Sequence, residues 1–273
     1  MSQSALSQTI RSLERQLGLQ LLRRSNTGAR TTDAGAILLR EARSLIEHHD
    51  RVLASVTGTT ATNARSLRLG VPLEFPPDLL PGVLAHLATT HPETRIQVQH
   101  AASAAQLVML KAAELDVALV RERPADPHFD AVLAVKEAMG VILARNQAEP
   151  VAGPEGVHLH DLAGLDWIGF SRSDTPAWYD QVSATLRSHG ISVNDRSDSD
   201  QRPVTAEVKL AAVGTGQAFA LASPDWPQPL PDGMSWFPLI GDPIVRRTWA
   251  VWPATSRRRD VAALVAALEI ANT

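Results

Sequence analysis

The sequence contains no cysteine among its 273 residues. This absence excludes disulfide bridges, thiolate metal sites and a cysteine nucleophile, and it fits a reducing cytosol. No apolar run approaches the roughly 18–20 residues that a membrane helix needs. The first 15 residues also lack the apolar stretch of a secretory signal. We therefore expect a cytoplasmic protein with no membrane partner.

The sequence also lacks a recognisable catalytic constellation, such as a nucleophile elbow or a histidine-rich metal motif. The segment Gly214-Thr215-Gly216 has no third glycine and precedes an expected strand, so we interpret it as a tight turn rather than a dinucleotide fingerprint. His158 and His160 have no further ligands nearby in sequence, and we interpret them as loop residues. We predict no enzyme activity, no cofactor and no metal site.

Charge is distributed unevenly along a chain of otherwise ordinary composition. Residues 1–56 contain eight arginines, no lysine and five acidic residues, a local balance of +3, whereas the whole chain has a formal net charge of −3. Such asymmetry is typical of a nucleic-acid-binding end.

Three regions differ in character. Residues 1–56 are expected to be helical, and residues 57–64 are small and polar, as in a flexible linker. The remainder alternates expected strands and helices in the order β-α-β-α-β, which predicts a parallel sheet with right-handed crossovers. The first strands are 67–71, 96–98 and 117–120, and the helices are 79–87 and 106–114. The pattern restarts near 167–170, with helices 178–189 and 204–213 and a strand at 217–222, which indicates a second α/β lobe.

An amphipathic helix opens the chain. Ser2 is a candidate N-cap and Gly18 a candidate stop, and one stripe is apolar, with residues Leu6, Ile10, Leu13 and Leu17. The opposite face carries groups suited to base edges and phosphates, namely Gln3, Ser7, Gln8 and Arg11. Amphipathicity by itself favours an ordinary surface helix.

The residues that follow change this interpretation. Residues 19–35 form a basic, glycine-containing stretch that leads into a helix capped by Thr32 or Asp33. A helix, a basic wing and a second helix occur in this order in a winged helix-turn-helix.

At this point the sequence resembles the LysR family of bacterial transcriptional regulators. It matches the family pattern at Ser2, Gln3, Ala5, Leu6, Ser7, Ile10, Leu13, Glu14, Leu17, Gly18, Leu21, Arg24, Gly28, Thr32, Ala34 and Gly35. It departs at Leu22, where the family prefers Phe, and at Thr31, where the family prefers Leu. The resemblance implies contact with double-stranded DNA by Ser2, Gln3, Ser4, Ser7, Gln8, Arg11, Arg24 and Arg30.

The family places two further helices before the recognition helix, and here the printed sequence begins at that helix. We interpret this as a start assigned at an internal codon, with a genuine truncation as the alternative. The expected head is therefore a partial winged helix-turn-helix over residues 1–34.

A long helix is expected to follow, over 35–57. Residues 38, 42, 45, 49, 52 and 56 form a heptad seam of three repeats, the minimum for a coiled coil. A single helix packed on its own domain stays an alternative. The family pairs subunits through this helix, which implies a homodimer or homotetramer.

The region from Leu67 onward resembles the family's effector-binding part, which has a type 2 periplasmic-binding-protein fold. We expect an α/β two-lobed effector domain after a hinge at 58–66. Subdomain I comprises 67–145 and 250–273, and subdomain II comprises 146–249.

Ligands in such folds bind at the carboxyl ends of strands, facing helix N-termini. The expected effector-binding residues are Leu73, Glu74, Ser103, Val120, Arg121, Ser173, Thr175, Pro176 and Trp178. Ser103 is a candidate N-cap with or without a ligand role, and Trp178 fits either a core residue or, like Phe75, an apolar wall. Glu74 would repel an anion unless Arg172 or Arg202 offset its charge.

The predicted function is transcription control by a small organic or aromatic acid bound between the lobes. The expected partners are operator DNA, the effector and a second copy of the chain, with RNA polymerase as a further candidate. The alternative is a ligand-binding module without DNA-binding activity, because the head is incomplete. A periplasmic solute-binding protein is disfavoured by the recognition-helix match and by the lack of a signal.

Overall fold

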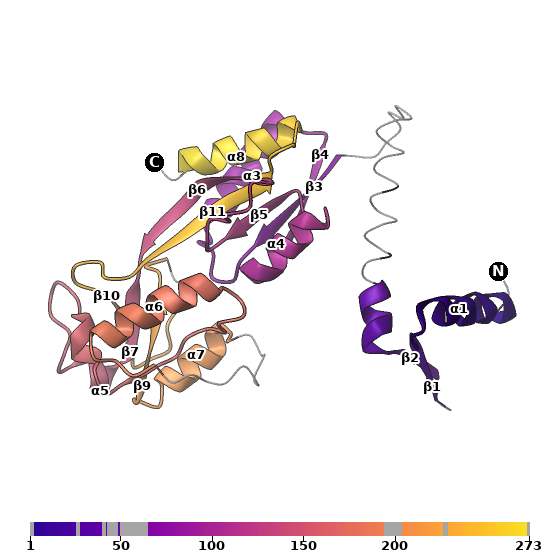
Figure 1. The fold of residues 1–273 in the computed structure, drawn as a ribbon. Helices are drawn as coiled ribbons and strands as arrows, with labels where there is room; N and C mark the ends of the chain where they lie inside the picture. The colour runs from indigo at the N-terminus through magenta and orange to yellow at the C-terminus, as the bar shows by residue number, and fades with distance from the viewer. Residues whose placement is uncertain are drawn as a thin grey trace. The chain divides into compact units, whose positions relative to one another are not determined.

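The computed structural model describes residues 3–25, 28–39, 42, 49, 65–193, 204–225 and 229–271. The chain divides into two compact units, residues 1–62 and residues 63–273, and each is described by itself (Figure 1). In the described part of the chain, no helix is both long and apolar enough to cross a membrane.

The N-terminal unit has the predicted helix–wing–helix order. Helix α1 (Gln3–Leu17) ends at Gly18, whose φ of +66° suits glycine. Strands β1 (Leu22–Ser25) and β2 (Gly28–Thr31) form an antiparallel hairpin. The hydroxyl of Thr32 accepts the Gly35 N–H at 3.0 Å, so Thr32 caps the helical residues 33–39.

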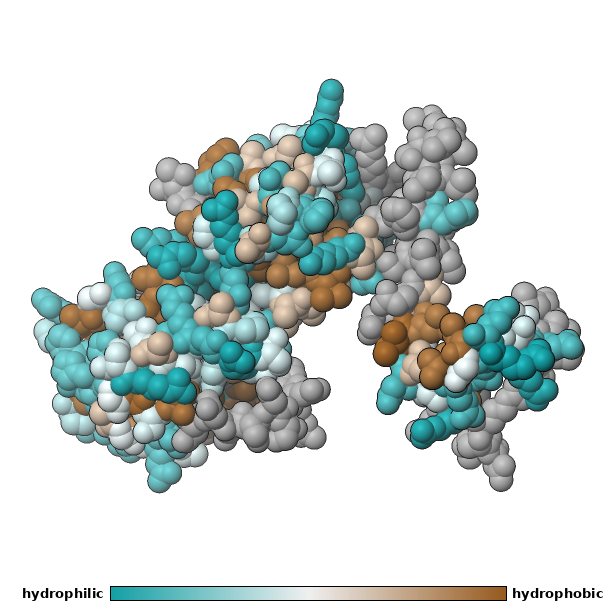
Figure 2. All heavy atoms as spheres, in the orientation of Figure 1, coloured by the Kyte–Doolittle hydropathy of each residue, from teal (hydrophilic) through white to brown (hydrophobic). Residues whose placement is uncertain are grey.

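The carboxylate of Glu14 ties the hairpin to α1. Its Oε1 accepts the backbone N–H groups of Leu21 and Leu22 at 2.8 and 3.1 Å. Leu21 is buried beside this junction, whereas five other apolar side chains of the unit are exposed: Leu13, Leu17, Leu19, Ile37 and Leu39. Figure 2 shows hydrophobic surface on this unit. Part of the apolar stripe expected on α1, Leu13 and Leu17, is therefore exposed within this unit.

The predicted heptad seam lies mostly outside the described residues. Of its six positions only Leu38, Ala42 and His49 are described; the first two are half-buried and His49 is exposed. Subunit pairing through this helix stays a prediction.

The first lobe of the second unit contains a five-stranded sheet in the order β4-β3-β5-β11-β6. Its strands are β3 (Arg65–Val71), β4 (Thr94–His100), β5 (Val117–Val120), β6 (Phe129–Ala138) and β11 (Val245–Pro253). β3 pairs in parallel with β4 and β5, which confirms the predicted parallel core. β11, however, runs antiparallel to both β5 and β6, so the sheet is mixed.

Helices cover both faces of this sheet (Figure 1). α3 (Leu79–Thr90) and α8 (Arg259–Ala271) lie on one face and α4 (Ser103–Lys111) on the other. Side chains of β5 therefore alternate between two cores: Val117 and Leu119 pack in the first, Ala118 and Val120 in the second. This double burial explains why β5 is apolar at every position.

The second lobe is built on a four-stranded sheet in the order β10-β7-β9-β8. Its elements are β7 (Gly140–Ala144), α5 (Arg145–Ala148), the 3-10 turn η1 (Leu159–Leu162), β8 (Asp166–Trp167), α6 (Pro176–Ser188), α7 (Ala206–Val213), β9 (Ala218–Ala222) and β10 (Met234–Pro238). Residues of α6 pack in one core with Phe219 and Leu221, and residues of α7 pack in the other with Ala220 and Ala222. Gly216, with a φ of +71°, lies in the tight helix-to-strand turn expected before β9.

The chain passes between the lobes at Met139 and again at Ile244, and the Met139 N–H donates to the Ile244 carbonyl at 2.9 Å. The predicted subdomain boundaries, after 145 and after 249, need correction. β7 belongs to the second sheet and the start of β11 to the first. Both crossings connect strands that pair antiparallel to their neighbours, which the parallel β-α-β pattern did not reveal.

Candidate functional site

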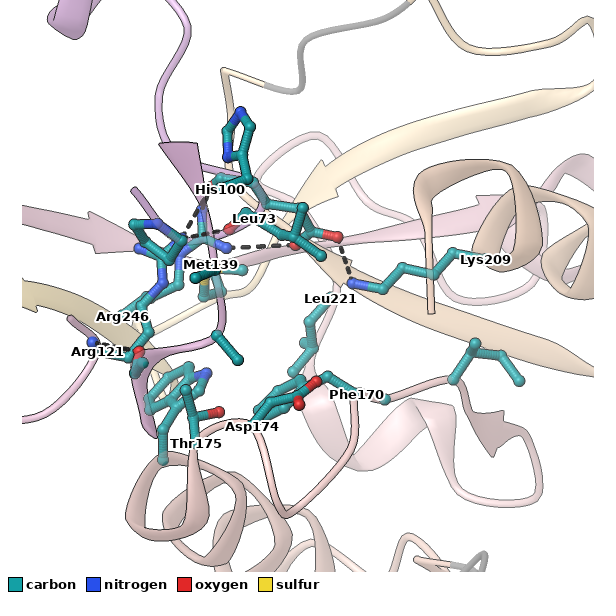
Figure 3. Close-up of a pocket in the computed structure, with 18 of the residues that line it drawn as sticks. Leu73, His100, Arg121, Met139, Phe170, Asp174, Thr175, Lys209, Leu221 and Arg246 are labelled. Atoms are coloured by element: carbon teal, nitrogen blue, oxygen red, sulfur yellow. Dashed lines mark hydrogen bonds and ion pairs between the residues drawn. The ribbon is translucent and has the colours of Figure 1, made fainter. Parts of the chain in front are cut away.

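A cavity of about 400 Å³ lies between the two lobes of the second unit. Six of the nine expected ligand residues line it: Leu73, Glu74, Ser103, Arg121, Thr175 and Trp178. The size suits a small-molecule ligand. The lining also includes residues that sequence reasoning missed, among them Asp174, Lys209 and Arg246 (Figure 3).

The other expected residues lie elsewhere. Val120 is fully buried in the core beneath α4, because alternate residues of β5 face opposite sides. Ser173 is exposed and its hydroxyl lies 2.7 Å from that of Ser171. Pro176 is exposed at the first position of α6, and Phe75 belongs to the first-lobe core.

Ser103 is not the N-cap of α4, contrary to expectation. Ala102 takes that position, and Ser103 is the first helical residue. The buried Ser103 hydroxyl oxygen accepts the Arg121 N–H at 3.0 Å, which joins the start of α4 to the end of β5.

A buried ionic network borders the cavity. Arg246 donates to both carboxylate oxygens of Glu137 at 3.0 and 2.9 Å, and its Nη1 lies 3.4 Å from Glu74 Oε2. Arg121 donates to the Leu73 and Glu74 carbonyls at 2.8 and 3.0 Å and to the Thr248 hydroxyl. Burial and the adjacent Arg246 lower the pKa of the Arg121 guanidinium.

Glu74 is held at the centre of this network with a φ of +55°. Burial by itself would raise its pKa, but Lys209 and Arg246 outweigh burial, and the pKa lies below its ordinary value. The negative charge of Glu74, which was expected to repel anions, is therefore offset by Lys209 and Arg246 rather than by Arg172 or Arg202. Arg172 pairs with Asp180 at the surface at 2.7 Å, and Arg202 lies outside the described residues.

The side chain of Lys209 extends from α7 to the cavity, where its ammonium group is a hydrogen-bond donor (Figure 3). The residue is 5% exposed, and its ammonium donates to Glu74 Oε1 at 2.5 Å. An ammonium has three N–H donors. Within the part of the chain that the structure describes, the other two have no protein acceptor.

Acidic groups gather at the N-terminus of α6. Glu122 Oε1 accepts the N–H groups of Ala177 and Trp178 at 2.9 and 3.3 Å. Burial raises the pKa of Asp174. Two amides at the start of α6 are thus occupied by a carboxylate of the first lobe.

Apolar side chains line much of the remaining cavity, including Met139, Phe170 and Leu221 (Figure 3). Trp167 and Phe170 meet edge to face, with ring centroids 5.9 Å apart. Trp178 lines the cavity and also belongs to the second-lobe core, so it is both a core residue and part of the cavity wall.

Two of the eight residues expected at DNA have described side chains. Gln8 and Arg11 are both exposed on α1. Arg24 and Arg30 lie on the paired strands of the hairpin, where Arg30 is in register with Arg23. Ser2 lies outside the described residues, and Gln3, Ser4 and Ser7 are described only as part of α1.

Both units match models of the same protein family. Residues 60–271 match the LysR substrate binding domain, and residues 1–36 match the bacterial regulatory helix-turn-helix protein, lysR family.

Among curated relatives, the regulator BenM of Acinetobacter baylyi is 27% identical over 81% of this chain and 72% of its own length. The dual regulator OxyR of Escherichia coli strain K12 is 31% identical over 90% of this chain and 79% of its own length. The solved structure of CbnR, a LysR family transcriptional regulator, has a TM-score of 0.71 at 20% identity and covers 100% of this chain and 91% of its own. A second structure holds CbnR with its target DNA and has the same TM-score of 0.71.

Proposed function

Because the chain belongs to the LysR family of bacterial transcriptional regulators, we propose that it binds double-stranded DNA and responds to a small organic acid in the cavity between its lobes. On this proposal, the protein acts in the cytoplasm as a homo-oligomer whose subunits pair through residues 35–57. Ligand binding changes the relation of the two lobes and so biases the DNA-bound state.

The observation that carries the acid effector is the buried ammonium of Lys209. A buried cation with two donors that no described residue fills favours an acceptor with negative charge, and a ligand carboxylate supplies one. The hydroxyl of Thr175 also lines the cavity and has no protein partner among the described residues. The aromatic and aliphatic walls suit an apolar ligand body.

Replacing Lys209 by methionine is expected to weaken the binding of benzoate and 4-methylbenzoate about tenfold or more. Hydrogen bonds to charged groups contribute about 1.5–3 kcal/mol, and each 1.4 kcal/mol is about tenfold in affinity. Isothermal titration of the wild type and the variant measures the change directly.

Lys111→Met is the matched control, since Lys111 is exposed and pairs with Asp126 at 2.8 Å away from the cavity. Benzoate affinity should be the same in this variant as in the wild type. Equal affinities in Lys209→Met and Lys111→Met would contradict an acid site at Lys209.

DNA binding is supported by the way the wing is attached to α1. Glu14 and Thr32 fix the hairpin beside the helix that presents Gln8 and Arg11 to solvent. The side-chain amide of a glutamine on a recognition helix suits base edges, and an arginine suits phosphates.

Arg11→Ala should weaken binding to all duplexes alike and reduce the slope of log affinity against log salt by about one. Gln8→Ala should instead change the preference between sequences. Fluorescence anisotropy with the region upstream of its own gene and with scrambled duplexes separates the two effects. Arg145→Ala serves as the charge control, because Arg145 is exposed at the start of α5. Failure of the wild type to bind any duplex would instead favour a ligand-binding module without DNA activity.

A further inference from the structure

The cavity has chemically different polar regions. Lys209 and Arg246 bring positive charge beside Glu74, and two N–H donors of Lys209 have no acceptor among the described residues. Asp174 and Thr175 line the cavity and directly precede α6. Glu122, which is not part of the lining, accepts amide N–H groups of that helix, so this acidic region carries two carboxylates. Arg172, the cation nearest to them in sequence on that lobe, is paired with Asp180 instead.

Asp174 is the acidic side chain of this region that lines the cavity. Its backbone carbonyl accepts the Ala104 N–H at 3.2 Å, which joins the lobes. Its carboxylate has no cationic partner among the described residues, although it lines the cavity.

Glu122 completes the acidic region. Its carboxylate fills the two amide donors that a ligand anion would otherwise use at the start of α6. A ligand carboxylate placed there would meet Glu122 and Asp174 instead of free donors, and like charges repel.

We propose, on the basis of the acid-effector function above, that the ligand is dipolar: a small acid whose carboxylate binds Lys209 and whose other end carries a cationic hydrogen-bond donor for Asp174. An ammonium group satisfies this acidic region best, because it supplies both charge and donors to a partly desolvated carboxylate. Dicarboxylates are selected against by the same geometry.

The test uses three benzoates that differ only in one ring substituent, each in its 3- and 4-isomer so that ring geometry does not decide the result. They carry a methyl, an aminomethyl or a carboxylate group. We expect the better aminomethylbenzoate isomer to bind the wild type at least about tenfold tighter than its methyl counterpart. The matching dicarboxylate should bind more weakly than the methyl compound.

Three variants assign the effect. Asp174→Asn should abolish the aminomethyl preference, measured as the ratio of aminomethylbenzoate to methylbenzoate affinity in the same variant. Glu122→Gln keeps an acceptor at α6 but removes its charge, and should raise dicarboxylate affinity about threefold or more. Asp180→Asn, on the same helix but paired with Arg172 outside the cavity, should leave all three affinities unchanged.

The outcomes separate this inference from the function on which it rests. If methylbenzoates bind through Lys209 but aminomethylbenzoates bind no tighter, or if Asp174→Asn keeps the preference, the dipolar ligand is wrong and the acid effector stands. If no benzoate binds the wild type, both are overturned.

Discussion

Replacing Arg246 by methionine should lower the free energy of unfolding of the two-lobed unit by about 3–5 kcal/mol. Arg246 is 4% exposed and donates to Glu137 and Glu74, so its removal deprives the buried Glu137 and the half-buried Glu74 of a partner. Urea denaturation followed by tryptophan fluorescence measures the change. A buried charge without a partner is costly because no water replaces the lost hydrogen bonds.

The neighbouring residue provides the control. Arg247 is on the same strand, β11, but is exposed on its other side, and Arg247→Met should change stability by no more than about 0.5 kcal/mol. The double variant Arg246→Met, Glu137→Met should be less destabilised than the sum of its single changes, because the two side chains interact directly. Equal effects of Arg246→Met and Arg247→Met would show that the network does not stabilise the fold.

Replacing Gly35 by alanine should reduce DNA affinity at least about tenfold, a loss of roughly 1.4 kcal/mol or more. A Cβ at Gly35 would lie 2.1 Å from the Leu21 carbonyl oxygen and 2.9 Å from its carbon. Backbone atoms cannot rotate away as a side chain would, so either the helical residues 33–39 or the start of the hairpin must move. The Leu21 carbonyl also accepts the Thr32 N–H, and the Leu21 N–H donates to Glu14, so the displacement reaches the proposed DNA-binding face.

Gly82→Ala is the matched control for this substitution. Gly82 lies in α3 of the other unit, and a Cβ there meets nothing within 4 Å. Alanine should stabilise that helix by about 0.5–1 kcal/mol and leave DNA affinity unchanged. Fluorescence anisotropy on one duplex compares the two variants. DNA binding by Gly35→Ala at wild-type strength would show that the junction tolerates movement.

Local patterns determined several features from the sequence alone. The spacing of Ile10, Leu13 and Leu17, the left-handed stop at Gly18 and the cap at Thr32 depend on residues within a few positions of one another. The β-α-β order likewise follows from short apolar runs, and β3, β4 and β5 pair in parallel as expected. Hydrophobic periodicity and capping are short-range effects, so they can be recognised without a fold.

The lobe boundaries were decided only by tertiary structure. β6 and β11 are long strands of partly exposed, alternating character, and they join the first sheet antiparallel to each other. Nothing in the sequence of either strand specifies its partner, because register and pairing depend on which surfaces the rest of the sheet leaves uncovered.

The cavity shows the same division between local and long-range information. Strand ends predicted from the sequence placed Leu73, Glu74 and Arg121 at its wall. Lys209 meets Glu74 across 135 residues of sequence, and Glu122 meets the start of α6 across 55. Such pairs form because folding removes both charges from water, and a charge out of water needs a partner. No local sequence pattern encodes which charges will meet. The sequence by itself thus determined the local elements and the edge of the sheet where a ligand would bind, while the tertiary structure decided the charge that the ligand meets there.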